Sequence, residues 1–308
     1  MVSHVAHEAL QRELAALPGV HCIQLDPDQP PPPGLRAEIL VTTSMHGSRV
    51  AQWMDPAIGI DWVHVFGTGV DGFDIAAVGS RELTCSRGAT AVPMAEWVMA
   101  MLLACVKQLP ESWCSEPPSR WRHARLHSLA GQTLALVGLG SIGQAVARRA
   151  RAFDMEVRAL VRRPRPEGVE GVELVADVDA LVAGADHVVL AAPATAATHH
   201  LINTRTLAKM KPGAHLVNVA RARLIDEQAL RRALDEGHLS RASLDVAEPE
   251  PLPAGHWLYH HPRVRFSPHV SWSDPAVMAE MSRRLVDNLR HWLAGRPLEH
   301  RVDKQAGY

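Results

Sequence analysis

The sequence predicts an α/β protein with a doubly wound parallel sheet and a second, smaller α/β domain. Its 308 residues are enough for two hydrophobic cores. An apolar run at residues 134–137 leads into a glycine-rich turn and then into a helical pattern. Beyond that turn, short apolar runs alternate with helical stretches, a pattern typical of parallel sheets covered by helices.

The composition excludes several classes of protein. The chain has 47% hydrophobic and 21% charged residues, as ordinary globular proteins do, and a net charge of -1 provides no basic face for nucleic acid. The four cysteines show neither C-x-x-C nor metal-ligand spacing, so we expect reduced thiols, no metal and a cytoplasmic protein. We expect no signal peptide, and the longest apolar stretch, near residues 94–106, is too short to span a bilayer.

The first third of the chain predicts a small α/β domain. An amphipathic pattern predicts a helix over residues 4–17, ended by Pro18-Gly19. Apolar runs predict strands at residues 20–25, 39–43 and 63–66, with a proline-rich loop over residues 27–34. The turn after the third strand, residues 67–71, is by itself an ordinary glycine turn.

Two segments precede the glycine-rich turn of the larger domain. Residues 93–106 predict a long core helix, with Pro93 in the first turn, where its missing N–H costs nothing. Residues 110–123 predict an irregular arm. Its Trp113 and Trp121 either contact a second subunit or pack on their own domain.

The glycine-rich turn has the spacing G-x-G-x-x-G between a buried strand and a helix expected over residues 144–153. Gly138 permits a tight turn, Gly140 lets the backbone approach a pyrophosphate, and Gly143 lets helix and strand pack closely. The free N–H groups at the start of a helix favour negative charge. A second strand expected at residues 156–161 completes the unit, which predicts a dinucleotide site.

The remaining elements alternate as a doubly wound sheet requires. Strands are expected at residues 172–175, 187–190, 215–219 and 243–246. Helices are expected over residues 177–183, 204–210 and 226–236, and a final helix from Asp274-Pro275 to Leu293.

Three polar clusters follow predicted strands, at the edge where such sheets bind ligands. They occupy residues 218–223, 245–251 and 266–271. Taken alone, Arg221 is explained as a surface charge, Glu250 as part of a solvated loop and His269 as a structural histidine. The three clusters in this order, downstream of a dinucleotide fingerprint, favour a catalytic site instead.

Four motifs make nearly the whole chain resemble the D-isomer-specific 2-hydroxyacid dehydrogenases. They are residues 137–143, residues 218–221 with 225–227, residues 244–251, and residues 267–269. The resemblance implies a Rossmann dinucleotide-binding domain over residues 98–274. It also implies a smaller, flavodoxin-like substrate-binding domain from residues 1–97 and 275–308, and a homodimer.

The resemblance also implies the roles of site residues. It places Arg221, Glu250 and His269 at the family's catalytic positions. The implied cofactor-binding residues are Gly138, Gly140, Ser141, Ile142, Gly143, Pro193, Ala220 and Asp245. The implied substrate-binding residues are Thr68, Gly69, Val70 and Arg221, so the turn at residues 67–71 gains a function.

These residue types suit hydride transfer from a nicotinamide to a 2-oxo acid. Reduction builds negative charge on the carbonyl oxygen, to which a protonated His269 can supply a proton. A neighbouring Glu250 would favour the imidazolium form. The planar fork of Arg221 can hold the carboxylate and polarise the carbonyl.

The chain departs from the family pattern at two places. It enters its first helix almost at once, so we expect either a first domain without an edge strand or a sequence that starts late. Relatives carry an aspartate at the end of the second Rossmann strand, where this chain reads Val161-Arg162-Arg163. The missing acid, with Arg162 and Arg163 beside it, favours the 2′-phosphate of NADPH.

We therefore predict an NADPH-dependent oxidoreductase that reduces a small 2-oxo acid to the D-2-hydroxy acid. The resemblance to NADPH-using members of the family suggests glyoxylate or hydroxypyruvate as the substrate. Two alternatives are a dinucleotide-sensing, corepressor-like binding protein on the same fold and a formate-oxidising enzyme. Retention of Arg221, Glu250 and His269 argues against the sensor, which needs no proton donor. Formate-oxidising relatives place a glutamine where this chain has Glu250.

Overall fold

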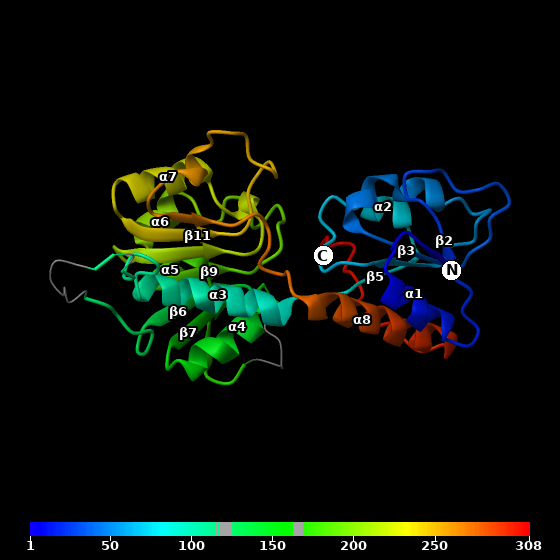
Figure 1. Ribbon diagram of the computed structural model, residues 1–308, viewed down its shortest axis with the longest axis horizontal. Helices are drawn as coiled ribbons and strands as arrows, with labels where there is room; N and C mark the ends of the chain where they lie inside the picture. Colours follow the sequence, from blue (N-terminus) through cyan, green and yellow to red (C-terminus); the bar gives the residue numbers. More distant parts are fainter. Residues whose placement is uncertain (115, 118–124, 163–168) are drawn as a thin grey trace. The chain divides into compact units, whose positions relative to one another are not determined.

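The computed structural model describes residues 1–114, 116–117, 125–162 and 169–308. The chain divides into two compact units. The first unit contains Met1–Thr90 and Asp274–Tyr308, and the second contains Ala91–Ser273. Each unit is built on a sheet of its own (Figure 1).

The first unit has a five-stranded sheet in the order β2-β1-β3-β4-β5, with parallel pairing throughout. The strands are β1 (Val2–Ser3), β2 (Ile23–Gln24), β3 (Ile39–Thr42), β4 (Trp62–Val65) and β5 (Glu82–Cys85). The helical segments are α1 (Glu8–Ala15), η1 (Ser44–Trp53), α2 (Ile75–Val78) and α8 (Pro275–Leu293).

Both faces of this first sheet are buried. On one face, Val63 of β4 packs in a core with Trp53 of η1. On the other face, Trp62 of β4 packs with Leu10 of α1 and Leu285 of α8. Neighbouring residues of β4 therefore point into different cores, as the period of two in a strand requires.

The expectation of a first domain without its opening strand was wrong. Val2 in β1 pairs with Ile23 of β2 on one side and with Leu40 of β3 on the other. Two residues are too few to show the alternation that identifies a strand, so only the neighbouring strands reveal it. The helix predicted from residue 4 begins at Glu8, because His7 is its N-cap and accepts a hydrogen bond from the Leu10 N–H.

The second unit has a seven-stranded sheet in the order β12-β11-β10-β9-β6-β7-β8. Its strands are β6 (Thr133–Val137), β7 (Glu156–Leu160), β8 (Val172–Val175), β9 (His187–Leu190), β10 (Ala214–Asn218), β11 (Leu239–Leu244) and β12 (Val264–Phe266). Its helical segments are α3 (Ala91–Val106), α4 (Ser141–Ala152), α5 (Val178–Val182), α6 (Thr204–Lys209), η2 (Ala222–Leu224), α7 (Glu227–Asp235) and η3 (Trp257–Tyr259). All its strand pairs are parallel.

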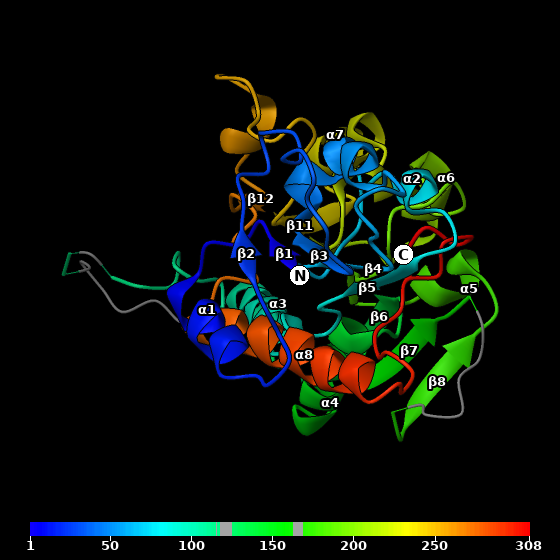
Figure 2. The same cartoon turned by 90° about the vertical axis from the view of Figure 1, so that its right-hand side faces the viewer.

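Helices cover both faces of the second sheet (Figures 1 and 2). On one face, Leu102 of α3 and Val146 of α4 pack in a core with Leu136 of β6. On the other face, Leu181 of α5, with residues of α6 and α7, packs against Leu190 of β9. The predicted doubly wound parallel sheet is confirmed, and its strand order reverses direction between β6 and β9.

Two helices begin before their predicted starts. Helix α4 begins at Ser141, with Gly140 as its N-cap, so Gly143 lies within its first turn. A glycine inside a helix is unfavourable by about 1 kcal/mol, which is why the sequence pattern predicted a later start. Helix α3 begins at Ala91, and Pro93 remains within its first turn.

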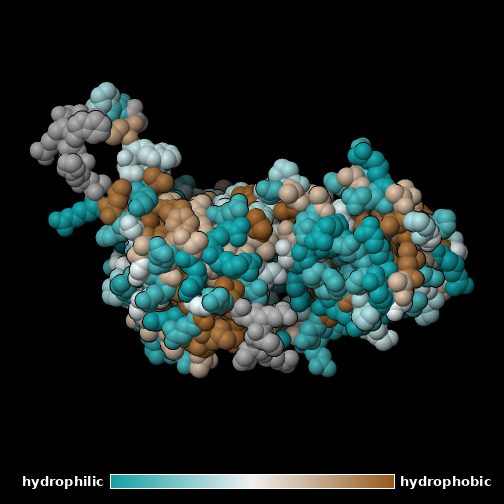
Figure 3. All heavy atoms as spheres, turned by 90° about the horizontal axis from the view of Figure 1, so that it is seen from below, coloured by the Kyte–Doolittle hydropathy of each residue, from teal (hydrophilic) through white to brown (hydrophobic). Residues whose placement is uncertain are grey.

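In the described part of the chain, no helix is long and apolar enough to cross a membrane. Figure 3 shows one face of the molecule, on which hydrophilic residues predominate and hydrophobic ones form small groups. Trp113 of the predicted arm is 70% exposed. Trp121 of the same arm lies outside the described residues.

Candidate active site

The turn between β6 and α4 requires glycine at two positions. Gly138 has a φ of +97°, and a Cβ there would lie 2.8 Å from the carbonyl oxygen of Ala191. A Cβ on Gly143 would lie 2.1 Å from the carbonyl oxygen of Gly138. Both glycines therefore permit backbone segments to approach more closely than any side chain allows.

Gly140 has a different environment, which fits a dinucleotide pyrophosphate. A Cβ at Gly140 would meet nothing within 4 Å, and no side chain caps the start of α4. The first turn of α4 contains no acidic residue. Ser141 is exposed and Ile142 half-buried, so the helix start presents free N–H groups beside an open space.

The residues expected beside the adenosine follow β7 and β9. Arg162 is exposed just beyond the end of β7, whereas Arg163 lies outside the described residues. Pro193 is half-buried beyond the end of β9, and its carbonyl oxygen accepts a 2.7 Å hydrogen bond from Thr198 Oγ1. This bond fixes the direction of the loop after β9.

Buried Asn218 shapes the loop that carries Arg221. The Asn218 Nδ2 group donates to the carbonyl oxygen of Arg221 at 2.8 Å, and the Ala220 N–H donates to Asn218 Oδ1 at 2.9 Å. Arg221 is half-buried, and its Nη1 donates to the Ala220 carbonyl oxygen at 2.6 Å. The side chain of Asn218 therefore replaces the sheet hydrogen bonds that end with β10.

His269 and Glu250 form a direct pair. His269 Nδ1 lies 2.8 Å from Glu250 Oε2, and Glu250 Oε1 accepts the Ala247 N–H at 3.0 Å. The side chains of His269 and Glu250 are 38% and 41% exposed, so the pair remains accessible to small molecules. With Nδ1 bound to a carboxylate, Nε2 is the nitrogen that can meet a substrate.

Asp245 holds the loop that carries His269. It is 1% exposed, and its Oδ1 accepts from Ser267 Oγ at 2.5 Å and from the Val270 N–H at 2.9 Å. Its Oδ2 accepts from the Ser271 N–H at 2.9 Å. Sequence reasoning missed these contacts, because nothing in Ser267 indicates which acceptor its hydroxyl meets, and the backbone N–H groups of Val270 and Ser271 carry no sequence signal.

Five loops of the second unit carry the expected residues at one edge of its sheet. The strand order β12-β11-β10-β9-β6 places the loops of His269, Asp245, Arg221, Pro193 and Gly138 next to one another in that order. Parallel strands end at the same edge, which is where doubly wound sheets bind ligands.

The remaining expected residues lie in the first unit. Thr68 and Gly69 are half-buried and Val70 is 5% exposed, in the turn that follows β4. At the start of this turn, the carbonyl oxygen of Gly67 accepts the N–H of Ser86, just beyond β5, at 2.8 Å. This turn is thus anchored to the sheet of its own unit.

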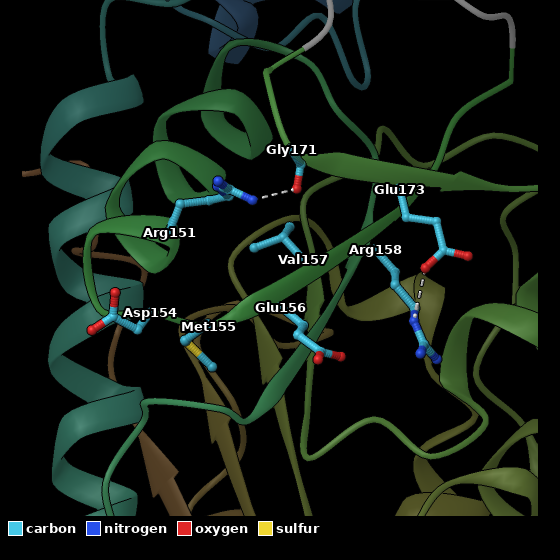
Figure 4. Close-up of a pocket in the computed structure, with 8 residues that line it drawn as sticks. All are labelled: Arg151, Asp154, Met155, Glu156, Val157, Arg158, Gly171 and Glu173. Carbon is cyan, nitrogen blue, oxygen red and sulfur yellow. Dashed lines mark hydrogen bonds and ion pairs between the residues drawn. The ribbon is translucent and has the colours of Figure 1, made fainter.

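A separate cavity of about 440 Å³ lies at the opposite edge of the second sheet, where β7 and β8 begin (Figure 4). Both of its arginines have partners in the structure. Arg151 Nη1 donates to the Gly171 carbonyl oxygen at 2.8 Å, and Arg158 Nε lies 3.2 Å from Glu173 Oε2. The cavity is therefore separate from the loops that carry the expected catalytic residues.

An open glycine turn where strand order reverses is the arrangement by which Rossmann oxidoreductases bind a dinucleotide, and the protein is of that class. A family model described as D-isomer specific 2-hydroxyacid dehydrogenase, NAD binding domain, matches residues 99–271. The chain belongs to the D-isomer-specific 2-hydroxyacid dehydrogenase family and is an NAD(P)-dependent oxidoreductase. The resemblance seen in the four sequence motifs is confirmed.

The chain is similar in sequence to named relatives over most of its length. Glyoxylate/hydroxypyruvate reductase B of Citrobacter koseri is 34% identical over 249 residues, which cover 77% of this chain and 76% of that protein. D-3-phosphoglycerate dehydrogenase of Methanocaldococcus jannaschii is 33% identical over 87% of this chain. The match covers only 52% of that longer protein.

A solved structure shares the architecture. The D-isomer specific 2-hydroxyacid dehydrogenase from Xanthobacter autotrophicus Py2, in complex with NADPH and MES, matches with a TM-score of 0.84 and 27% identity. The match covers 100% of this chain and 98% of that one.

Proposed function

We propose that the enzyme reduces a small 2-oxo acid of the glyoxylate or hydroxypyruvate type to the D-2-hydroxy acid, with NADPH as the reductant. The observation that carries the proposal is the 2.8 Å contact between His269 and Glu250, on loops that follow neighbouring strands. Relatives named glyoxylate/hydroxypyruvate reductase and hydroxypyruvate reductase support the substrate class.

In this proposal the cofactor lies along one edge of the second sheet. Its pyrophosphate binds at Gly138, Gly140 and Gly143 and at the start of α4, and the bound nicotinamide supplies a hydride. The other proposed cofactor-binding residues are Ser141, Ile142, Arg162, Pro193, Ala220 and Asp245. We assign cofactor binding to residues 98–274, and substrate binding to residues 1–97 and 275–308.

His269 is the proposed proton donor. Glu250 holds Nδ1, so the proton on Nε2 is the one that passes to the substrate carbonyl oxygen as negative charge develops there. Each reduction consumes the proton that His269 donates, so the ring must take up another proton before the next turnover.

Arg221 is the proposed electrostatic partner of the substrate. Its guanidinium has donors on a fixed plane, so it can bind the substrate carboxylate and the carbonyl oxygen together. Backbone N–H groups of Thr68, Gly69 and Val70 are the proposed second contact with the carboxylate. Arg221 thereby stabilises the charge that forms during hydride transfer.

We further propose that the enzyme prefers NADPH, acts in the cytoplasm and forms a homodimer. Arg162 supports the preference for NADPH, because the segment after β7 presents a cation where a ribose-binding aspartate is expected. The four cysteines form no disulfides, which supports the cytoplasmic location. The homodimer is supported by Trp113, a large exposed hydrophobic side chain of the kind that subunit contacts bury.

One experiment tests the function and its main alternative. The purified protein is assayed with glyoxylate, hydroxypyruvate and larger 2-oxo acids, each with NADPH and with NADH. We expect turnover of the small acids and a kcat/KM at least about tenfold higher with NADPH, the effect of one hydrogen bond to a charged group. A protein that binds NADPH tightly but reduces no 2-oxo acid would instead be the dinucleotide-sensing protein.

A further inference from the structure

Arg223 and Glu248 form an ion pair between two loops that carry proposed catalytic residues. Arg223 Nε donates to Glu248 Oε1 at 2.7 Å and to Oε2 at 2.8 Å, and Arg223 Nη2 lies 2.5 Å from Oε1. Arg223 follows Arg221 by two residues, and Glu248 precedes Glu250 by two. The pair therefore joins the loop after β10 to the loop after β11.

Contacts continue from this pair to the loops on either side. The carbonyl oxygen of Arg223 accepts the His200 N–H at 2.8 Å, which joins the loop after β10 to the loop after β9. On the other side, Glu250 joins the loop after β11 to His269 in the loop after β12. The ion pair of Arg223 and Glu248 is thus a link in a series of contacts across four neighbouring loops.

The ion pair of Arg223 and Glu248 can fix the orientation of the two loops as well as the distance between them. A guanidinium that binds both oxygens of a carboxylate restricts orientation as well as distance. The hydrogen bond from Arg223 lowers the pKa of the Glu248 carboxyl, so Glu248 stays ionised at neutral pH. The side chains are 65% and 47% exposed, so salt weakens their attraction.

We propose that Arg223 and Glu248 are positioning residues, which hold the loop of Arg221 against the loop of Glu250. The kinetic consequence rests on the proposed function, in which Arg221 and His269 act on one substrate. The pair itself need not touch the substrate. Because exposed ion pairs are weak, its loss should reduce kcat about two- to fivefold and not abolish turnover.

The kinetic test uses Arg223→Gln and the charge reversal Arg223→Glu with Glu248→Arg. We expect Arg223→Gln to lower kcat about two- to fivefold with an unchanged Kd for NADPH, and the reversed pair to recover most of the loss. The loss should shrink in about 1 M salt, which screens the exposed pair. The control, Arg205→Gln, removes an exposed arginine that pairs with the half-buried Asp179 between α5 and α6, and it should leave kcat unchanged.

Amide hydrogen exchange tests the link without catalysis. In the protein without ligands, Arg223→Gln should speed exchange over residues 246–250, whereas Arg205→Gln should not. Unchanged exchange, an unchanged kcat, or a reversed pair that recovers nothing would overturn the positioning role. Faster exchange in a protein that reduces no 2-oxo acid would support the link and reject the proposed function.

Discussion

The backbone of His269 has a φ of 55°, in the left-handed region that residues other than glycine seldom adopt. Its N–H donates to the carbonyl oxygens of Asp245 at 2.8 Å and Ser267 at 3.0 Å, and its own carbonyl oxygen accepts from Trp272 Nε1 at 2.9 Å. These bonds keep the conformation in place, and with Glu250 at Nδ1 they fix the direction of the imidazole.

The first prediction concerns this imidazole. His269→Ala should lower kcat for 2-oxo acid reduction about 10²- to 10⁴-fold, because the variant lacks the general acid. The Kd for NADPH, measured by fluorescence titration, should hardly change. His260→Ala, at an exposed histidine of the same unit, is the control. A kcat within a few-fold of the unaltered protein would reject His269 as the proton donor.

The second prediction concerns the fork of Arg221. Arg221→Lys keeps the charge but cannot reproduce both contacts of a guanidinium. Loss of one charge-assisted hydrogen bond should lower kcat/KM about 10- to 150-fold. Arg148→Lys, at an exposed position of α4, should have no effect. Steady-state kinetics that match the unaltered protein would show that Arg221 does not contact the substrate.

The third prediction concerns the choice of cofactor at Arg162, which is exposed beyond β7. Arg162→Ala should remove most of the preference for NADPH and leave kcat/KM with NADH nearly intact, because only the 2′-phosphate requires the cation. The preference should also weaken as salt rises. Arg148→Ala serves as the control. If the unaltered protein uses NADPH and NADH equally, the assignment of Arg162 fails.

The turn from β6 to α4 shows how two glycines of one motif serve different purposes. A Cβ on Gly143 would press on the backbone of Gly138, whereas a Cβ on Gly140 would enter open space. Neither Gly140 nor Gly143 has a positive φ. The difference between them is therefore one of available space, not of backbone strain.

The fourth prediction separates these purposes. Gly143→Ala should lower the free energy of unfolding by up to about 2 kcal/mol, because overpacking costs about 1–3 kcal/mol and replacing a helical glycine regains about 1 kcal/mol. Gly140→Ala should lower the free energy of unfolding by no more than about 1 kcal/mol, because alanine is a poorer N-cap than glycine but its Cβ meets no atom within 4 Å. The same variant should weaken NADPH binding. Calorimetry of the protein without ligands and NADPH titration measure the two effects. A large fall in Tm for Gly140→Ala would contradict this division.

Buried histidines occur in the sheets of both units. In the second unit, His187 Nε2 lies 2.7 Å from Gln132 Oε1, His187 Nδ1 lies 3.3 Å from His215 Nδ1, and His215 Nε2 lies 2.9 Å from Ser243 Oγ. Burial lowers the pKa of His187 to about 4 and that of His215 well below its ordinary value. In the first unit, burial lowers the pKa of His64 to about 3.

The fifth prediction is that mild acid destabilises the whole molecule. Between about pH 6.5 and 4, His64, His187 and His215 become protonated in the unfolded chain but stay neutral in the folded protein. The free energy of unfolding should therefore fall as pH drops, by up to about 1.4 kcal/mol per pH unit for each histidine. The contribution of these neutral histidines to the free energy of unfolding is fully present above about pH 6.5.

Urea denaturation at several pH values measures this slope. Gln replaces the ring without a group that titrates, so His64→Gln and His187→Gln should each flatten the dependence between about pH 6.5 and 4. His260→Gln, at an exposed histidine, should leave it unchanged. A stability that stays constant over this range would contradict the burial of neutral histidines.

Local signals explain which elements the sequence predicted. The strand expected at residues 172–175 is β8 (Val172–Val175), and the helix expected to end at Leu293 does so, because turn residues and a C-terminal glycine mark these limits. Strand β5 (Glu82–Cys85) and helix α2 (Ile75–Val78) were not predicted. Four residues carry too little periodicity to identify an element, which only pairing and packing then reveal.

The family, the doubly wound fold and the candidate set Arg221, Glu250 and His269 can be predicted from the amino-acid sequence alone, since motifs of fixed spacing carry that information locally. In contrast, the bonds by which Asp245 holds the loop of His269, and the ion pair of Arg223 with Glu248, are seen only in the folded chain. These contacts join residues 22 and 25 positions apart. No local pattern encodes them, because the neighbouring places of β10, β11 and β12 in the sheet bring the loops together.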